Sequence, residues 1–142
     1  AAKHHLTVTL HNLGKPTGLS RTYPNLMTYE AVRNLEYNKF NDHPSTPEHE
    51  IYVAFIRILA GPLDYHSGGF RYTTLENFHA QNVAPLVVGT RARELARYVV
   101  FEDYLPMMAD YPAAYRVQKG LQTIVKMPET VIVGPHYDNS DS

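Results

Sequence analysis

The stretch Leu6–His11, LTVTLH, alternates apolar and polar residues and is rich in β-branched side chains. This pattern is typical of a β-strand. A second run, Ile51–Leu59, is apolar almost throughout, with Arg57 as its charged exception. Such a continuous run fits a parallel strand that is covered on both faces. Both stretches lead into polar loops that contain glycine, Asn12–Gly18 and Gly61–Gly69. Loops in this position carry the chemistry of α/β enzymes, so the sequence predicts that class.

Helices are expected between and after these strands. The stretch Tyr29–Tyr37 is expected to form about two helical turns. Thr46 followed by Pro47 is typical of a helix N-cap with proline at the first helical position. Thr90 is expected to cap a helix over Arg91–Tyr104, where alanine, leucine and valine recur at helical spacing. Strands and helices that alternate in this way indicate an α/β fold.

The length of the chain limits how much of such a fold it can hold. A further helix over Tyr115–Val125 and a short strand over Thr130–Val133 bring the total to about three strand–helix units. A complete (β/α)8 barrel needs about 250 residues, whereas this chain has 142. We therefore expect residues 1–142 to form part of one barrel domain. Its open sheet edges would pair with segments outside the chain or cause self-association.

The composition excludes several classes of function. The formal net charge is -1, which does not indicate a nucleic-acid or an anionic-membrane partner. The absence of cysteine excludes a disulfide scaffold and a thiolate metal site. No apolar run approaches the roughly 20 residues of a membrane span. The 11 tyrosines suit sugar-binding platforms and also suit ordinary half-buried packing.

Two glutamates are the first candidates for chemistry. Glu30, Arg33 and Glu36 are spaced three apart, so on a helix Arg33 would bridge both carboxylates in a solvated salt-bridge stripe. The functional alternative places both glutamates at a cleft, with one as a proton donor and the other as a metal or sugar ligand. Paired carboxylates are the usual equipment for cleaving glycosidic bonds.

Other polar residues are open to two interpretations. His11 ends the first predicted strand, where it would bind a substrate hydroxyl or cap the sheet. Asp64 follows the second predicted strand, and a turn aspartate that accepts backbone N–H groups is the simpler interpretation. His43 and His49 match no zinc motif and are expected in a solvated loop.

Three blocks of sequence, which occur in the right order, favour the functional interpretation of these residues. The stretch Lys15–Asn38, KPTGLSRTYPNLMTYEAVRNLEYN, resembles the catalytic stretch of glycoside hydrolase family 97. Phe55–Tyr65 resembles a later barrel strand of that family, and Ala96–Asp110 is similar to its final barrel helices. The resemblance covers roughly residues 1–125. It implies the C-terminal half of a (β/α)8 TIM barrel, and hence a piece of a longer enzyme.

The resemblance also implies an activity and roles for individual residues. The family hydrolyses α-glucosides or α-galactosides and binds calcium near the active site. By position, Glu36 matches the general acid or acid/base, Glu30 a calcium ligand, and His11 a substrate-contacting histidine. An oligosaccharide substrate and a periplasmic or secreted location in a bacterium follow from the same resemblance.

Position 12 decides between two mechanisms. Inverting members carry a glutamate base there, but this chain has Asn12, whose amide cannot take a proton from water. Asn12 is therefore expected to contact substrate only. Retaining members use an aspartate nucleophile on an earlier barrel strand, which would precede Ala1. We expect a retaining enzyme, with the chain alone inactive. The alternatives are an inverting α-glucosidase with another base and a non-catalytic carbohydrate-binding fragment.

Overall fold

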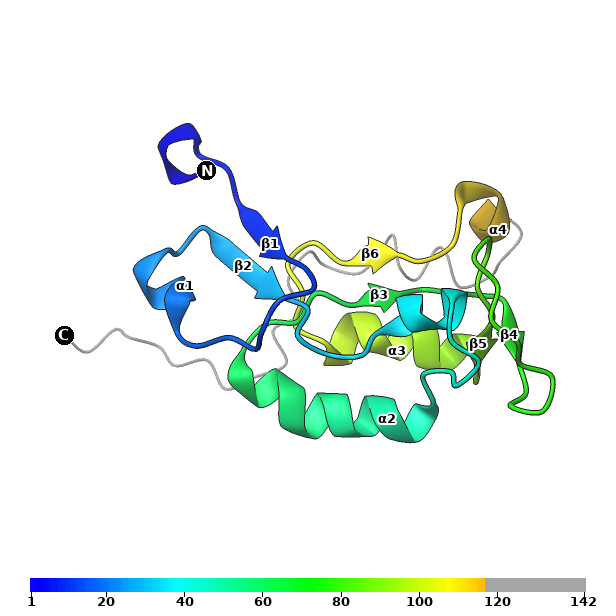
Figure 1. The fold of residues 1–142 in the computed structure, drawn as a ribbon. Coiled ribbons are helices and arrows are strands. Elements are labelled where there is room, and N and C mark those ends of the chain that lie inside the picture. Colours follow the sequence, from blue (N-terminus) through cyan, green and yellow to red (C-terminus); the bar gives the residue numbers. More distant parts are fainter. Residues whose placement is uncertain (117–142) are drawn as a thin grey trace.

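The computed structural model describes residues 1–116 as a series of short strands and helices (Figure 1). The predicted strand over Thr130–Val133, and the part of the predicted helix beyond Arg116, lie outside the described residues. In chain order the elements are a 3-10 turn Ala2–His4, β1 Val8–Leu10, α1 Leu19–Thr22, β2 Leu26–Tyr29, a 3-10 helix Leu35–Lys39, α2 Pro47–Tyr52, a π-helical turn Val53–Arg57, a 3-10 turn Ile58–Ala60, β3 His66–Ser67, β4 Tyr72–Thr73, β5 Val87–Val88, α3 Arg91–Val100, β6 Met107–Met108 and α4 Pro112–Arg116.

The strand pairs are all parallel in the part of the chain that the structure describes. The predicted first strand is confirmed as β1, which pairs with β2. Tyr29, at the end of β2, forms a parallel bridge to Leu63, a few residues before β3. β3 in turn pairs with β6, and the two run side by side in Figure 1. Parallel strands that follow one another with helices between them are the arrangement expected of an α/β protein.

The prediction of a strand over Ile51–Leu59 is wrong, because this stretch is helical. α2 begins after Thr46, whose side chain accepts a hydrogen bond from the N–H of His49 as predicted, and helical turns continue to Ala60. Val53 and Arg57, one turn apart, are buried, whereas other apolar residues of the run, such as Phe55, lie on the exposed side. A short apolar run does not distinguish a buried strand from a helix by its periodicity.

The predicted helix over Tyr29–Tyr37 is also wrong. Tyr29 is the last residue of β2, and Ala31 has a positive φ of 40°, a conformation that ends regular structure. The following 3-10 helix begins only after Asn34, whose side chain caps it by accepting the N–H of Glu36. The helical salt-bridge stripe therefore does not form, and no ion pair of Arg33 occurs within residues 1–116.

α3 begins at the predicted residue, but the face that it buries is not the predicted one. Thr90 caps it, but the helix ends at Val100, where Phe101 takes up an extended conformation. Its buried residues are Glu94 and Arg97 and not the predicted apolar stripe. Arg97 forms ion pairs with Glu94 and with Glu50 of α2. A buried charge is tolerated only with partners, and this network joins α2 to α3.

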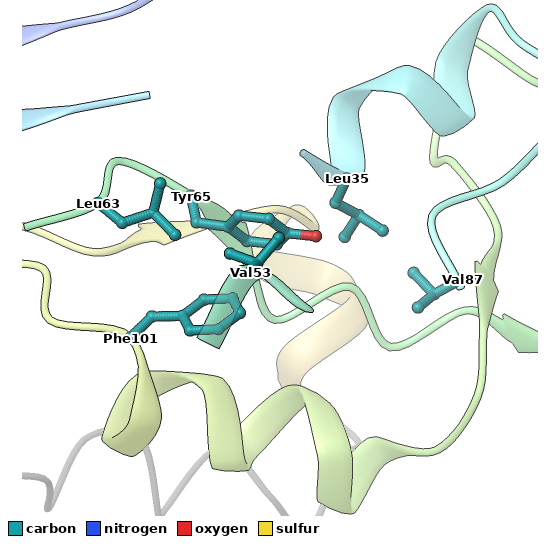
Figure 2. Packing of buried hydrophobic residues seen from close by; sticks show 6 residues of the cluster. All are labelled: Leu35, Val53, Leu63, Tyr65, Val87 and Phe101. Atoms are coloured by element: carbon teal, nitrogen blue, oxygen red, sulfur yellow. The ribbon is translucent and has the colours of Figure 1, made fainter. Parts of the chain in front are cut away.

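The hydrophobic core lies between the helices and the strands (Figure 2). Val53 comes from the helical run after α2, and Phe101 follows α3. The ring of Phe101 packs edge-on against Tyr65, with their ring centroids 4.9 Å apart. The other members shown in Figure 2 are Leu35, Leu63 and Val87. None of the helices within residues 1–116 has the length and apolar character needed to cross a membrane.

Candidate active site

The ends of neighbouring parallel strands bring the candidate residues together. His11 follows β1, Glu30 follows β2, and Asp64 follows Leu63, the residue that bridges to β2. The carboxyl ends of parallel strands lie at one edge of a sheet, where α/β proteins place their ligands. Glu36 reaches the same edge from the 3-10 helix that follows β2.

His11 is the centre of this cluster. Its Nδ1 lies 2.8 Å from Oδ2 of Asp64, and its Nε2 lies 3.1 Å from Oε1 of Glu36 and 3.2 Å from Oε1 of Glu30. Burial by itself lowers the pKa of His11, but the hydrogen bonds to Asp64 and Glu36 and the charge of Glu30 outweigh it. The pKa therefore lies above its usual value, so the cluster favours a protonated imidazole.

Asp64 was expected as an ordinary turn aspartate, but it holds His11 instead. Its side chain is only 2% exposed, and the contact to Nδ1 fixes the ring. A buried carboxylate on one imidazole nitrogen orients the other nitrogen, here toward the two glutamates.

Glu30 is almost completely buried, with 5% of its side chain exposed. Its Oε2 accepts the backbone N–H of Asn12 at 2.7 Å, and its Oε1 accepts the side-chain amide of Asn34 at 2.5 Å. Burial raises the pKa of Glu30, and the hydrogen bond from Asn12 opposes this shift only in part. Within residues 1–116, His11 is the only basic side chain in ion-pair contact with this carboxylate.

Glu36 is the more accessible of the two glutamates, with 31% of its side chain exposed. Asn34 holds its backbone, because Oδ1 of Asn34 accepts the N–H of Glu36 at 2.7 Å. Oε1 of Glu36 faces His11, and the side chain also lines a cavity of about 330 Å³. A carboxyl group that is both anchored and open to a cavity is suited to exchange a proton with a ligand.

Asn12 lies beside these residues, but the described contact is made by its backbone. The residue is exposed and has a positive φ of 54°, and its N–H points at Glu30. The expected contact between its side chain and substrate stays a prediction.

His66 was missed in the sequence although it belongs to the cluster. Its ring lies 5.1 Å from that of His11, and its Nδ1 lies 3.0 Å from Oδ1 of Asn34 and 3.9 Å from Oε2 of Glu36. Burial lowers the pKa of His66, and the charge of Glu36 only partly offsets this. A histidine on a strand next to a glycine-containing loop was the available signal. The incorrect strand at Ile51–Leu59 hid it, because the true strand starts later.

The two other histidines that were considered lie apart from this cluster. His43 is exposed as predicted, whereas His49 belongs to α2 and its Nε2 contacts the carbonyl of Arg33 at 2.7 Å. Neither contacts the glutamates in the part of the chain that is described.

Ligand atoms of His11, Glu36 and His66 lie within 4.8 Å of one another, close enough to hold a metal ion. Two of these donors are nitrogens, whereas calcium takes six to eight oxygen ligands. This triad therefore does not match calcium, and any fit to calcium depends on Glu30.

The comparisons with known sequences find a glycoside hydrolase profile and two α-galactosidases. The profile of a family described as glycoside hydrolase 97 matches residues 1–32. A retaining alpha-galactosidase of Bacteroides thetaiotaomicron is 40% identical over 116 residues, which are 80% of this chain and 17% of that protein. A probable retaining alpha-galactosidase of Streptomyces bingchenggensis is 31% identical over 114 residues, 80% of this chain and 16% of that protein. The chain thus spans about one sixth of these curated relatives.

In fold, the chain is similar to solved structures of glycoside hydrolase family 97 enzymes. A glycoside hydrolase family 97 enzyme from Pseudoalteromonas sp. strain K8, in complex with acarbose, is 37% identical. It superimposes with a TM-score of 0.73 over 90% of this chain and 19% of that chain. A variant of a family 97 enzyme from the same strain, in complex with panose, is also 37% identical. It superimposes with a TM-score of 0.75 over 91% of this chain and 19% of that chain.

Proposed function

The chain is related in sequence and in fold to the enzymes of glycoside hydrolase family 97, and on this premise we propose that it serves α-glycoside hydrolysis. The substrate is a terminal α-galactoside or α-glucoside of an oligosaccharide, and Glu36 is the acid/base of a retaining reaction. One observation carries the proposal: Glu36 is anchored by His11 at the strand ends and still opens onto a cavity.

The chemistry assigned to Glu36 has two steps. Its carboxylic acid gives a proton to the glycosidic oxygen while the bond from that oxygen to the anomeric carbon breaks and a carboxylate nucleophile bonds to that carbon. Glu36 is then a carboxylate and removes a proton from the water that hydrolyses the glycosyl-enzyme. His11 and Asn34 keep its position constant through both steps.

The features of two other residues bear on the form of the reaction and on where its nucleophile lies. Asn12 offers only an amide where an inverting enzyme needs a base. Asp64 is a carboxylate near the site, but its burial and its contact to His11 prevent it from attacking a sugar. We propose that the nucleophile belongs to a strand of the same (β/α)8 barrel that is not part of this chain.

We also propose that Glu30 is a calcium ligand. The fit is partial: Glu30 and Glu36 each place a carboxylate oxygen within 3.2 Å of the same nitrogen of His11, so both face one point. A cation bound beside these carboxylates, in place of the proton of His11, would stabilise the charged form of Glu30, which its burial disfavours. Two carboxylates are too few for a complete calcium shell, so further oxygen ligands would come from outside the chain.

The decisive experiment replaces Glu36 with glutamine in the enzyme that contains this chain. Glu36→Gln keeps the shape but carries no acidic proton, so we expect kcat/KM on unactivated disaccharides to fall about 100- to 10,000-fold. An aryl glycoside with a good leaving group should retain much more activity, because its departure needs little protonation. Glu76→Gln, in an exposed loop, is the matched control. If Glu36→Gln were as active as the unmodified enzyme on both substrates, Glu36 would not be the acid/base.

The isolated chain tests the absent nucleophile separately. We expect little or no hydrolysis of aryl α-galactosides or α-glucosides by the purified chain, and rapid turnover would contradict the placement of the nucleophile outside this chain. For calcium, we expect the metal to raise the melting temperature of the wild-type enzyme and chelation to lower it, with no such response in Glu30→Gln.

Export to a bacterial periplasm or the medium and self-association of the chain remain part of the same proposal.

A further inference from the structure

Arg57 is a buried cation whose partners are carbonyl groups and not acids. It ends the π-helical turn after α2, one turn beyond Val53 of the core (Figure 2), and is 8% exposed. Its Nη1 donates to the carbonyl of Gly61 at 2.9 Å, and its Nη2 donates to the carbonyls of Tyr29 at 2.7 Å and Pro62 at 3.4 Å. No carboxylate in the described part of the chain forms an ion pair with it.

A cation without an acidic partner is an expensive way to fill this space. Burial lowers the pKa of Arg57, since it disfavours the charged guanidinium, and an apolar side chain of similar length would pack there without that cost. Arginine carries its N–H donors in a rigid planar fork, so it holds several oxygens at fixed positions. What arginine adds here is thus the fixed geometry of three carbonyl groups.

The carbonyl groups held by Arg57 belong to the two strands that carry acidic residues of the site. Tyr29 precedes Glu30, and the other two carbonyls belong to residues shortly before Asp64. The carbonyl of Tyr29 also accepts the N–H of Asp64 at 2.9 Å, whereas the N–H of Tyr29 reaches the carbonyl of Pro62 only at 3.4 Å. The pairing of the two strands is a single isolated bridge in the described residues, so Arg57 reinforces a pairing that is weak by itself.

The relative position of these strands decides whether their carboxylates reach His11. Oδ2 of Asp64 lies 2.8 Å from Nδ1 of His11, and Oε1 of Glu30 lies 3.2 Å from its Nε2. A slip of one residue between paired strands turns every side chain of the slipped strand to the other face of the sheet. A smaller shift lengthens the hydrogen bond between His11 and Asp64, which orients the ring toward Glu36.

We propose that Arg57 is a positioning residue of the active site. Its guanidinium fixes the strand segment of Asp64 against the end of β2, so that Asp64 meets His11 and His11 meets Glu36. Arg57 forms no hydrogen bond with these three side chains and acts through the backbone. This inference rests on the proposed function, since it takes the reaction at Glu36 as the one that is served. Because Arg57 does not line the cavity beside Glu36, its loss should lower kcat and leave KM nearly unchanged.

The test uses two substitutions in the enzyme that contains this chain. Arg57→Met keeps a long side chain but removes the carbonyl contacts, so we expect kcat on a disaccharide to fall about tenfold or more, with KM changed less than about threefold. Arg57→Lys keeps the charge but lacks the planar fork, so its kcat should lie between those of Arg57→Met and the unmodified enzyme. Arg93→Met is the matched control, because Arg93 pairs with Glu50 and Glu94, which do not belong to the site. Its kcat should stay within about twofold of the unmodified value.

A double-mutant cycle with Asp64→Asn separates positioning from a general weakening of the fold. In the Asp64→Asn enzyme, Arg57→Met should lower kcat less than about twofold further, since the contact that Arg57 supports is already weakened. Unchanged kcat in folded Arg57→Met, or an equal loss with and without Asp64→Asn, would overturn the inference and leave the proposed function standing. If Arg57→Met does not fold, the same two outcomes are measured with Arg57→Lys. An unmodified enzyme that hydrolyses neither α-galactosides nor α-glucosides would overturn both.

Discussion

A buried ion-pair network joins α2 to α3. Arg97, 3% exposed, pairs with Glu50 and Glu94, and Glu94 also accepts the backbone N–H of Gly68 at 3.2 Å, next to β3. We expect Arg97→Met to destabilise the chain strongly at neutral pH. The methionine fills much of the space but leaves two buried carboxylates with less positive charge.

The magnitude follows from the cost of burying these carboxylates. Burial raises the pKa of Glu94 from 4.5 to about 7, even though Arg97 and Arg93 oppose the shift. At 1.36 kcal/mol per unit, this shift means that Glu94 reduces stability by about 3 kcal/mol at high pH. Removing one partner of a buried ion pair typically costs a further 3–5 kcal/mol, which is our estimate for Arg97→Met at pH 7.

The sign of the pH dependence distinguishes charge from packing. Because the folded-state pKa of Glu94 is raised, the folded state holds its proton more tightly than the unfolded state does. The contribution of Glu94 to stability is therefore most favourable below about pH 4.5 and falls as the pH rises toward about 7. Without Arg97 the carboxylates of Glu94 and Glu50 protonate more readily still. The destabilisation by Arg97→Met should thus fall by at least half between pH 7 and pH 5.

Urea unfolding of the purified chain, followed by circular dichroism at both pH values, measures these differences. Arg91→Met is the control, since Arg91 is on the exposed face of the same helix and stacks on Tyr72. Its free energy of unfolding should change by less than about 1 kcal/mol. A loss in Arg97→Met that is equal at pH 5 and pH 7 would refute the electrostatic reasoning, and no loss at pH 7 would refute the network itself.

Three further predictions concern the site and its support. In the enzyme that contains this chain, Asp64→Asn should lower kcat/KM about 10- to 100-fold, because it weakens the charged hydrogen bond that orients His11; unchanged kinetics would contradict this. Burial raises the pKa of Asp103 to about 6, so Asp103→Asn should stabilise the chain above that pH by about 1 kcal/mol after allowance for its partial exposure, with no gain at pH 4. A Cβ on Gly69 would lie 2.6 Å from Cγ2 of Val87, so Gly69→Ala should cost about 1–3 kcal/mol in urea unfolding. The added substitution Val87→Ala should recover part of that loss.

The sequence by itself predicted the elements whose signals are local. The alternation around β1 needs no partner to be recognised, and Thr46 and Thr90 cap α2 and α3 through bonds to N–H groups three residues later. Side-chain caps of this kind depend on a few neighbouring residues, so their pattern is visible in the sequence. The order of the three sequence blocks also singled out Glu36, Glu30 and His11, which the structure brings together, whereas the roles inferred for them stay predictions.

Only the tertiary structure decided which way the longer segments fold and face. The apolar run Ile51–Leu59 is helical with Val53 directed to the core. α3 buries Glu94 and Arg97, because Arg97 pairs both with Glu94 and with Glu50 of another helix. Contacts between residues that are distant in the sequence also explain what the sequence left out of the site. The local sequence indicates at most that His66 adjoins a glycine-containing loop. The roles of Asp64 and His66 arise from contacts with His11 and Asn34, residues that lie 53 and 32 positions away along the chain.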